Sequence, residues 1–301
     1  MKLCNFLKIQ AMVNVYDFLK DQGEEYKKLA FKDVLFVYYQ CPQVEPFAKI
    51  YTHNNLIVYA ITGKKVYHTP GKSHLLSEGS GAFIKKGGYY QERFMDLDWV
   101  VIAFFMPDSF IQQFIKDHRT LLPLKTRVKE PLEIFTPIHI NEITKAFFEG
   151  MLSYFVQKPG PPENVIELKF HELLLNLLSD PQNNNILNYF INLSDTQKPL
   201  LHEVMEDNFM YNLSLDEYAR IAQRSIASFK REFVEIFKVS PGKWLTEKRL
   251  LYAQMLLNST PKNISEIAND SGFESASHFS RVFKEKFGTA PLQYRKYSTS
   301  T

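Results

Sequence analysis

Residues 271–297 read SGFESASHFSRVFKEKFGTAPLQYRKY, and residues 222–244 read AQRSIASFKREFVEIFKVSPGKW. The two stretches carry one pattern twice. Aromatic, cationic and proline positions recur fifty residues later: Phe229, Arg231, Phe233, Phe237, Pro241 and Trp244 correspond to Phe279, Arg281, Phe283, Phe287, Pro291 and Tyr294. Farther upstream the offset falls to forty-nine. A single-residue insertion in the second turn explains the change, because loops absorb insertions more readily than helices.

Each copy predicts two short helices joined by a tight turn. Apolar residues recur at helical spacing, and polar residues that can cap a helix stand where each helix would begin. The predicted caps are Ser214 with Glu217, Ser225, Asn263 with Glu266, and Ser275. A serine or asparagine followed three residues later by a glutamate is a capping box, in which each side chain binds a backbone N–H of the other residue. The pattern therefore predicts two helix-turn-helix motifs.

The side of each second helix opposite its phenylalanines carries short and cationic side chains. Short residues let a helix enter the major groove, about 12 Å wide, and arginine or lysine reads guanine edges or holds phosphates. The predicted DNA-binding residues are Ser225, Ala227, Ser228, Lys230 and Arg231 in the first copy, and Ser275, Ala276, Ser277, His278, Ser280, Arg281 and Lys284 in the second.

An interpretation without DNA binding stays open for this face. A solvated helix face is also polar, and Arg231 or Arg281 could pair within the chain, with Glu232 or Glu285. Two copies of the pattern at one spacing favour DNA binding over this alternative.

Residues 212–297 resemble the paired helix-turn-helix domain of AraC-type transcription regulators. The resemblance rests on the segments 273–275, 279–284, 287–288 and 291–295, and in the first copy on 228–233 and 240–241. It implies two recognition helices in successive major-groove segments on one side of double-stranded DNA. It also implies base contacts from the positions of Ala227, Lys230, Arg231, Ala276, Ser277, Ser280 and Arg281. Family members commonly have glycine in the first turn, where this chain has Gln223.

The segment between the copies supports that geometry. Residues 243–257 contain apolar positions at helical spacing with no glycine or proline, and predict one helix of roughly 22 Å. A stiff helix can hold two readers about one turn of DNA, ~34 Å, apart, whereas a flexible linker would lose that spacing.

Composition indicates a globular chain with room for two domains: 301 residues, 45% hydrophobic and 23% charged. Residues 210–301 hold fourteen lysines and arginines against nine carboxylates, an excess of +5, so the rest of the chain carries −2 of the net +3. The basic excess lies in the proposed DNA-binding segment. Cys4 and Cys41 show no metal or redox spacing, and no stretch resembles a signal peptide or a membrane span. We expect a cytoplasmic protein without a membrane partner.

Residues 29–106 predict a small antiparallel β-barrel. Short β-rich runs, separated by glycine and proline at hairpin-like intervals, occupy 34–39, 48–51, 56–61, 65–68, 81–85 and 99–105. AraC-type proteins often carry a cupin-like sensing domain here, and His53, Gly63 and residues 83–87 are similar to it. The fold class expected is α+β, with this barrel followed by an all-α DNA-binding domain.

The predicted barrel is aromatic, so a small effector could bind inside it, with His53, Tyr59 and Tyr67 as candidate contacts; an aromatic core without a ligand is the alternative. Metal-dependent cupins place two histidines one residue apart, whereas His53 is followed by two asparagines. His68 and His74 are more typical of surface histidines than of ligands. We expect no catalytic residues, no metal and no cofactor.

Residues 141–156 and 165–178 predict two apolar-faced helices between the barrel and the DNA-binding motifs. They either cover the barrel or form a homodimer contact, as a helix in this place often does in related regulators. The expected division is therefore 1–140 for sensing, 141–196 for a helical linker and possible dimer contact, and 197–301 for DNA binding.

The predicted function is sequence-specific regulation of transcription, as an activator, with RNA polymerase as a partner. Two alternatives stay open: a metal-dependent cupin enzyme with an appended helical domain, and a protein–protein interaction module.

Overall fold

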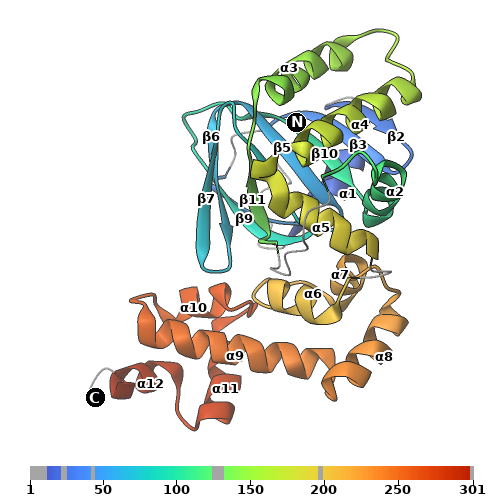
Figure 1. The fold of residues 1–301 in the computed structure, drawn as a ribbon. Helices are drawn as coiled ribbons and strands as arrows, with labels where there is room; N and C mark the ends of the chain where they lie inside the picture. The colour runs from blue at the N-terminus through green and yellow to red at the C-terminus, as the bar shows by residue number, and fades with distance from the viewer. Residues whose placement is uncertain (1–11, 22–25, 42–44, 124–131, 196–198, 299–301) are drawn as a thin grey trace. The chain divides into compact units, whose positions relative to one another are not determined.

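The computed structural model describes residues 12–21, 26–41, 45–123, 132–195 and 199–298, and Figure 1 shows its elements. The chain divides into two compact units, residues 1–199 and 200–301. The first contains both β-sheets and the second is entirely helical over its described residues, as the α+β prediction requires. Among the described helices, none combines the length and the apolar composition needed to cross a bilayer.

Two sheets form the framework of the first unit. The five-stranded sheet has the order β1 (Val13–Asn14), β4 (Phe47–Thr52), β9 (Gly87–Arg93), β6 (Lys64–Thr69), β7 (Lys72–Ser77). The six-stranded sheet has the order β11 (Phe135–Ile138), β8 (Gly81–Ile84), β5 (Asn55–Thr62), β10 (Val100–Met106), β3 (Val34–Gln40), β2 (Lys27–Phe31). The strand pairs are antiparallel, except that β1 runs parallel to β4, which the prediction of an antiparallel barrel did not include.

The six-stranded sheet is buried on both faces. Successive residues of a strand point to opposite faces. On β3, Val37 therefore joins the core between the two sheets, while Phe36 joins the core between this sheet and the helices. Because both faces are apolar, the strand appears in sequence as a continuous hydrophobic run rather than an alternating one.

Helices cover the outer face of this sheet. They are α2 (Asp108–His118), α3 (Glu142–Val156), α4 (Glu163–Ser179) and α5 (Asn184–Asp195), while α1 (Val15–Asp21) packs on the inner core. The predicted helices 141–156 and 165–178 correspond to α3 and α4. Phe170 of α4 is fully buried against Phe36 and Phe104, with ring centroids 5.0 Å and 5.5 Å apart.

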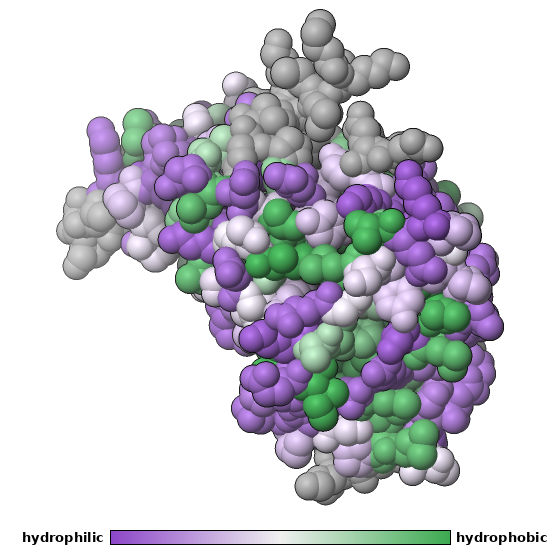
Figure 2. Space-filling model, turned by 90° about the horizontal axis from the view of Figure 1, so that it is seen from above, coloured by the Kyte–Doolittle hydropathy of each residue, from purple (hydrophilic) through white to green (hydrophobic). Residues whose placement is uncertain are grey.

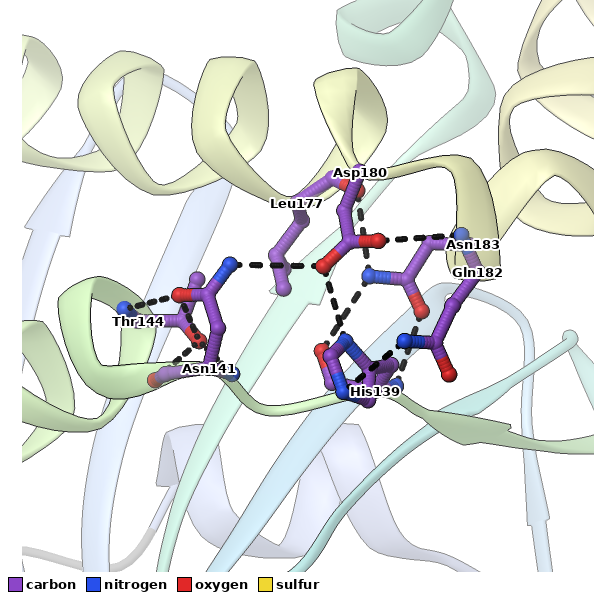
Figure 3. Close-up of polar contacts among 7 residues, drawn as sticks. All are labelled: His139, Asn141, Thr144, Leu177, Asp180, Gln182 and Asn183. Atoms are coloured by element: carbon purple, nitrogen blue, oxygen red, sulfur yellow. Dashed lines mark hydrogen bonds and ion pairs between the residues drawn. The ribbon is translucent and has the colours of Figure 1, made fainter.

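A polar cluster fixes the turn between α4 and α5 to the end of β11 (Figure 3). His139 Nδ1 lies 2.8 Å from Asp180 Oδ2, and the His139 backbone N–H donates to Asn183 Oδ1 over 2.8 Å. Asn183 Nδ2 donates to the carbonyl oxygen of Leu177 over 3.1 Å. These hydrogen bonds join the turn to the end of the strand and to the last turn of α4.

The second unit consists of α6 (Leu201–Asn208), α7 (Leu215–Ile221), α8 (Ile226–Phe237), α9 (Pro241–Ser259), α10 (Ile264–Asp270), α11 (Ala276–Phe287) and α12 (Pro291–Ser298). The pairs α7–α8 and α10–α11 are the two predicted motifs, and α9 is the predicted connecting helix, four residues longer than the predicted 243–257. At 1.5 Å per residue its nineteen residues span about 28 Å.

Candidate DNA-binding interface

Both motifs begin with the predicted capping boxes. Ser214 Oγ accepts a hydrogen bond from the Glu217 N–H over 3.3 Å, and Glu217 Oε2 accepts one from the Ser214 N–H over 2.6 Å. Asn263 and Glu266 repeat the exchange at 2.9 Å and 2.8 Å. The two first helices, α7 and α10, therefore start in the same way, which sets the two motifs in equivalent geometry.

The turns of the two motifs also have one shape. Gln223 has a φ of 55° and Gly272 a φ of 84°, both in the left-handed region. The residue after each, Arg224 and Phe273, donates its N–H over 2.9 Å to a carbonyl five residues earlier. The Gln223 turn is thus retained at the cost of a left-handed non-glycine residue.

Different side chains support these equivalent turns. In the first motif, Arg224 Nε donates to Glu232 Oε2 of α8 over 2.7 Å, and an Arg224 terminal nitrogen donates to the Ala222 carbonyl over 2.6 Å. In the second motif, the ring of Phe273 packs on Phe279 with centroids 5.2 Å apart. Glu274, the inserted residue, accepts a hydrogen bond from Asn212 over 3.0 Å.

Fully buried phenylalanines hold each second helix in place. Phe229 and Phe233 anchor α8, and Phe279 and Phe283 anchor α11. One turn farther along, each helix has a ring contact with the helix that follows its motif: Phe237 with Trp244 of α9 at 5.5 Å, and Phe287 with Tyr294 of α12 at 5.8 Å. Burial of these rings on one side dictates which residues of α8 and α11 face solvent.

The predicted DNA-binding side chains lie on those outer faces. Exposed are Ser225, Ala227, Lys230, Arg231, Ser275, Ser277, His278, Arg281 and Lys284, and half-buried are Ser228, Ala276 and Ser280. The hydroxyls of Ser225 and Ser275 cap their helices, accepting from the N–H groups of Ser228 and His278 over 3.2 Å each.

The arginines differ in their partners. Arg281 donates to Glu285 one turn away over 2.8 Å, and both side chains are more than half exposed, so the pair contributes little stability. Glu232 pairs with Arg224 rather than with Arg231. Within the described part of the chain, Lys230 and Arg231 have no ion pair.

Both motifs are attached to α9. Arg249 of α9 donates to the carbonyls of Phe209 and Tyr211, over 2.7 Å and 2.8 Å, near the start of the first motif. Toward the second motif, Gln254 Nε2 donates to the Tyr294 hydroxyl over 2.6 Å, and Lys286 forms an ion pair with Glu247. The connecting helix is therefore tied to the chain just before the first motif, to α12 and, through Lys286, to α11 of the second motif.

Two family profiles match the chain. Residues 55–189 match the family described as "ExsA N-terminal regulatory domain", and residues 218–297 match a "Helix-turn-helix domain" family. The thermoregulatory protein LcrF of Yersinia pestis is 27% identical over 266 residues, which are 86% of this chain and 95% of LcrF. The virulence regulon transcriptional activator VirF of Yersinia enterocolitica is 26% identical, over 85% of this chain and 94% of VirF. The chain belongs to the AraC-type family of transcription regulators.

Among solved structures, apo ToxT from Vibrio cholerae covers 88% of this AraC-type chain and 97% of its own, with 14% identity and a TM-score of 0.43. Family membership makes the protein a DNA-binding regulator of transcription, and its helical unit carries the DNA-binding motifs.

The effector candidates of this AraC-type regulator do not converge. The Tyr59 ring stacks on Phe148 of α3, with centroids 4.3 Å apart, on the outer face of the six-stranded sheet. Tyr67 lies in the core between the sheets. His53 follows β4, where its Nδ1 lies 2.9 Å from Asn14 Nδ2. The structure thus distributes the three residues over different environments.

The other histidines of the sheets have ordinary hydrogen bonds. His68 lies 2.8 Å from Ser73 Oγ and 3.0 Å from Glu92 Oε2, and His74 stacks on Phe135. Burial lowers the pKa of His74, which favours its neutral form. Within the described ranges, no three histidine, cysteine, aspartate or glutamate side chains are grouped so that they could hold a metal ion.

Gly272→Ala is expected to destabilise the helical unit by about 1–3 kcal/mol, the cost of a strained backbone position. A Cβ at this position would lie 2.8 Å from the Met210 carbonyl oxygen, and φ is 84°. Thermal unfolding followed by circular dichroism measures the loss. The matched control is Gly242→Ala in α9, where a Cβ would meet nothing within 4 Å. Equal stability of the two variants would contradict the role assigned to the turn.

Proposed function

We propose that the protein activates transcription by inserting α8 and α11 into successive major-groove segments on one side of its DNA site. The observation that carries the proposal is the equivalence of the two helices. Each begins with a serine cap, is anchored by two buried phenylalanines, and presents short and cationic side chains to solvent. Their common attachment to α9 supports a fixed spacing, which reading two groove segments requires.

In this proposal the side chains divide into readers and anchors. Arg231 and Arg281 read guanine edges, because a guanidinium can donate two hydrogen bonds to guanine O6 and N7. Lys230 and Lys284 hold phosphates. Ser277, His278 and Ser280 contact base edges or phosphates nearby, while Ala227 and Ala276 allow close approach of the helix.

A salt titration of DNA binding tests the proposal. Lysine and arginine contacts to phosphates release counterions, so the logarithm of the binding constant should fall linearly with the logarithm of salt concentration, with a slope of about −0.9 per phosphate contact. Electrophoretic mobility shift of a promoter fragment at several salt concentrations measures the slope. Absence of binding to any duplex, together with capture of a protein partner by α8 and α11, would support the interaction module instead.

Arg281→Ala is expected to weaken binding by about 1–3 kcal/mol and to relax the preference at one base pair. The reason is that the hydrogen bonds that favour guanine over the other bases are lost. The control is Glu285→Ala, which removes the intramolecular partner of Arg281 and one negative charge facing DNA. Its affinity should equal or exceed that of the parent. The measurement is a mobility shift with a panel of single-base variants of the site. An unchanged affinity and base preference in Arg281→Ala would remove this residue from the reader set.

Activation implies contact with RNA polymerase, which we propose as a partner. The relative VirF is a transcriptional activator, which supports this choice over repression. Transcription from a supercoiled template with purified polymerase would increase on addition of an activator and decrease on addition of a repressor.

We also propose that α3 and α4 form a homodimer contact. Three large apolar side chains on them are largely exposed, Ile143 at 62%, Val156 at 60% and Leu168 at 68%. Figure 2 shows hydrophobic side chains gathered between hydrophilic ones on one face of the molecule. Light scattering at micromolar concentration should give twice the chain mass of 35.2 kDa, and Leu168→Glu should halve it. A monomer mass for the parent would exclude this contact.

We propose that the first unit regulates DNA binding in response to a small effector. The arrangement of residues described above gives no support to a catalytic role. Elemental analysis that found a stoichiometric transition metal would instead favour the metal-dependent cupin enzyme.

A further inference from the structure

Two cationic side chains face each other inside the first unit. Lys65 of β6 and Arg93 of β9 are direct partners in the antiparallel register of the five-stranded sheet. Lys65 is 2% exposed and Arg93 is 6% exposed. Tyr67, two residues after Lys65, belongs to the core between the sheets, and residues two apart on a strand share a face. Both cations therefore project into the space between the two sheets.

The pair lies at one rim of that space. Lys65 is the second residue of β6, Arg93 is the last residue of β9, and Trp99 immediately precedes β10. Cys41 follows the end of β3 and donates its N–H to the Trp99 carbonyl over 2.9 Å. The mouths of β-barrels, where strands end and loops begin, are a common place for small-ligand sites.

No carboxylate of the described residues neutralises the pair. Neither Lys65 nor Arg93 belongs to any ion pair in the described ranges. The Arg93 side chain has one hydrogen bond among the described residues, a long one of 3.4 Å from a terminal nitrogen to the Glu45 carbonyl, and its buried Nε has no acceptor there. Lys65 Nζ lies 5.1 Å from the centre of the Trp99 ring, a cation–π contact, and the Lys65 side chain also forms a hydrogen bond with that of Cys41, but no carboxylate of the described residues pairs with it.

This arrangement costs stability. Like charges directly opposite each other on neighbouring strands repel, and a buried charge without a counter-ion loses its hydration. Burial lowers the pKa of Lys65 to about 8; Cys41 opposes this shift and Arg93 adds to it. Lys65 is still mostly protonated at pH 7, so two positive charges persist in an aromatic interior. An anion placed between them would relieve the repulsion and satisfy Arg93.

We propose that Lys65 and Arg93 bind the carboxylate group of a small organic acid, whose apolar part packs against Trp99 and Tyr67. A guanidinium fits a carboxylate with two parallel hydrogen bonds, and an ammonium adds a point charge beside it. The ring faces of Trp99 and Tyr67 suit an aromatic or aliphatic remainder rather than a second charge. Binding itself is independent of DNA; only its regulatory consequence depends on the proposed function.

Trp99 provides a direct reporter. The chain has two tryptophans, Trp99 and Trp244, so a Trp244→Phe background leaves only the one that contacts Lys65. Titration with sodium benzoate should change Trp99 fluorescence saturably and raise the melting temperature of the first unit. Benzamide, the neutral analogue of the same shape, should do neither. Sodium acetate and inorganic phosphate, each at constant ionic strength, distinguish a carboxylate site from a general anion site.

The decisive variant is Lys65→Met, with Lys72→Met as its matched control. Lys72 lies on β7 of the same sheet with its side chain 57% exposed. Lys65→Met should weaken the benzoate response at least about tenfold, because one charge of a buried charge-assisted contact is lost. Without benzoate it should melt at the same temperature as the parent or higher, since the like-charge repulsion is gone. A merely structural lysine would give the opposite pattern: lower stability and an unchanged response to benzoate. Lys72→Met should bind benzoate as the parent does.

Three outcomes would overturn the proposal. In the first, no anion of the panel changes the Trp99 fluorescence or the melting temperature of the parent at up to 10 mM, on the order of the weakest specific affinities. In the second, benzamide changes them as benzoate does; in the third, benzoate changes them equally in Lys65→Met and in the parent.

Mobility shifts with and without benzoate then test control of DNA binding. A benzoate response with no DNA binding at all would leave the site standing and refute the proposed function. DNA binding that ignores bound benzoate would refute only the regulatory consequence.

Discussion

Replacing Arg231 and Arg281 together by alanine is expected to weaken binding to the specific DNA site by about 2–6 kcal/mol, twice the cost of one base-reading arginine. The two residues lie on separate helices, α8 and α11, each anchored by its own pair of buried phenylalanines. Because they share no partner among the described residues, their single effects should add within about 0.5 kcal/mol. Mobility-shift titrations of both single variants and the double variant measure this sum.

The control for the double variant removes two positive charges elsewhere, Lys72→Ala with Lys262→Ala. Lys72 pairs with Glu133 in the first unit and Lys262 pairs with Asp270 of α10, so neither lysine lies on α8 or α11. This control should leave base preference unchanged and reduce affinity only slightly. An effect of the arginine pair equal to that of the control would mean that net charge, rather than groove reading, governs binding.

Asp108→Ala is expected to destabilise the first unit by about 3–5 kcal/mol. Asp108 at the start of α2 accepts hydrogen bonds from Lys86 Nζ over 2.5 Å and from Asn55 Nδ2 over 2.8 Å, and both charged side chains are almost fully buried. Tyr189 of α5 completes the network by donating to Asn55 Oδ1 over 2.9 Å. Removal of the carboxylate leaves the Lys86 charge buried without its counter-ion. Urea unfolding monitored by far-ultraviolet circular dichroism gives the change.

Two controls make the Asp108 result specific. Glu133→Ala breaks the exposed ion pair with Lys72 and should cost only about 0–1 kcal/mol. The double variant Lys86→Met with Asp108→Leu removes both charges and should recover most of the loss, because the penalty comes from one unpaired buried charge. A cost for Asp108→Ala no larger than that for Glu133→Ala would show that the network is unimportant to the fold.

The helical unit was predictable in detail because local signals decide it. The caps Ser214, Ser225, Asn263 and Ser275 all act as the sequence indicates. Because the pattern occurs twice at one spacing, a chance match was improbable, and the second copy supported reading the first as a helix-turn-helix motif. The first turn was the exception, because Gln223 stands where glycine is typical of a left-handed turn. Hydrogen bonds from Arg224 stabilise the same turn there.

The sheets were predictable only in part. The six predicted β-rich runs correspond to β3, β4, β5, β6, β8 and β10, whereas β1, β2, β7, β9 and β11 were not predicted. The β9 strand begins with Gly87 and Gly88, which are typical of turns, and it turns Gln91 and Arg93 inward. Charged and amide side chains in a sequence indicate exposure, so the buried pair of Lys65 and Arg93 could not be found without the register of β6 and β9.

Faces of the six-stranded sheet could not be assigned from the sequence either. Alternation reveals an inner face only when the other face is polar. Here Tyr59 and Phe104 point toward α3 and α4, while Val58 and Phe105 point toward the other sheet, and all four are buried. The prediction that Tyr59 and Tyr67 share one interior was therefore wrong: Tyr59 packs against the helices, together with Phe36, Phe83 and Phe104, whereas Tyr67 lies between the sheets.

Selection of bound duplexes from a random DNA pool tests the central claim most directly. If α8 and α11 are two readers fixed on one helix, the selected sequences should contain two short conserved blocks whose centres lie about ten base pairs apart, one turn of DNA. Arg231→Ala should relax one block and Arg281→Ala the other. A single conserved block, or blocks at variable spacing, would contradict a pair of recognition helices held rigidly by α9.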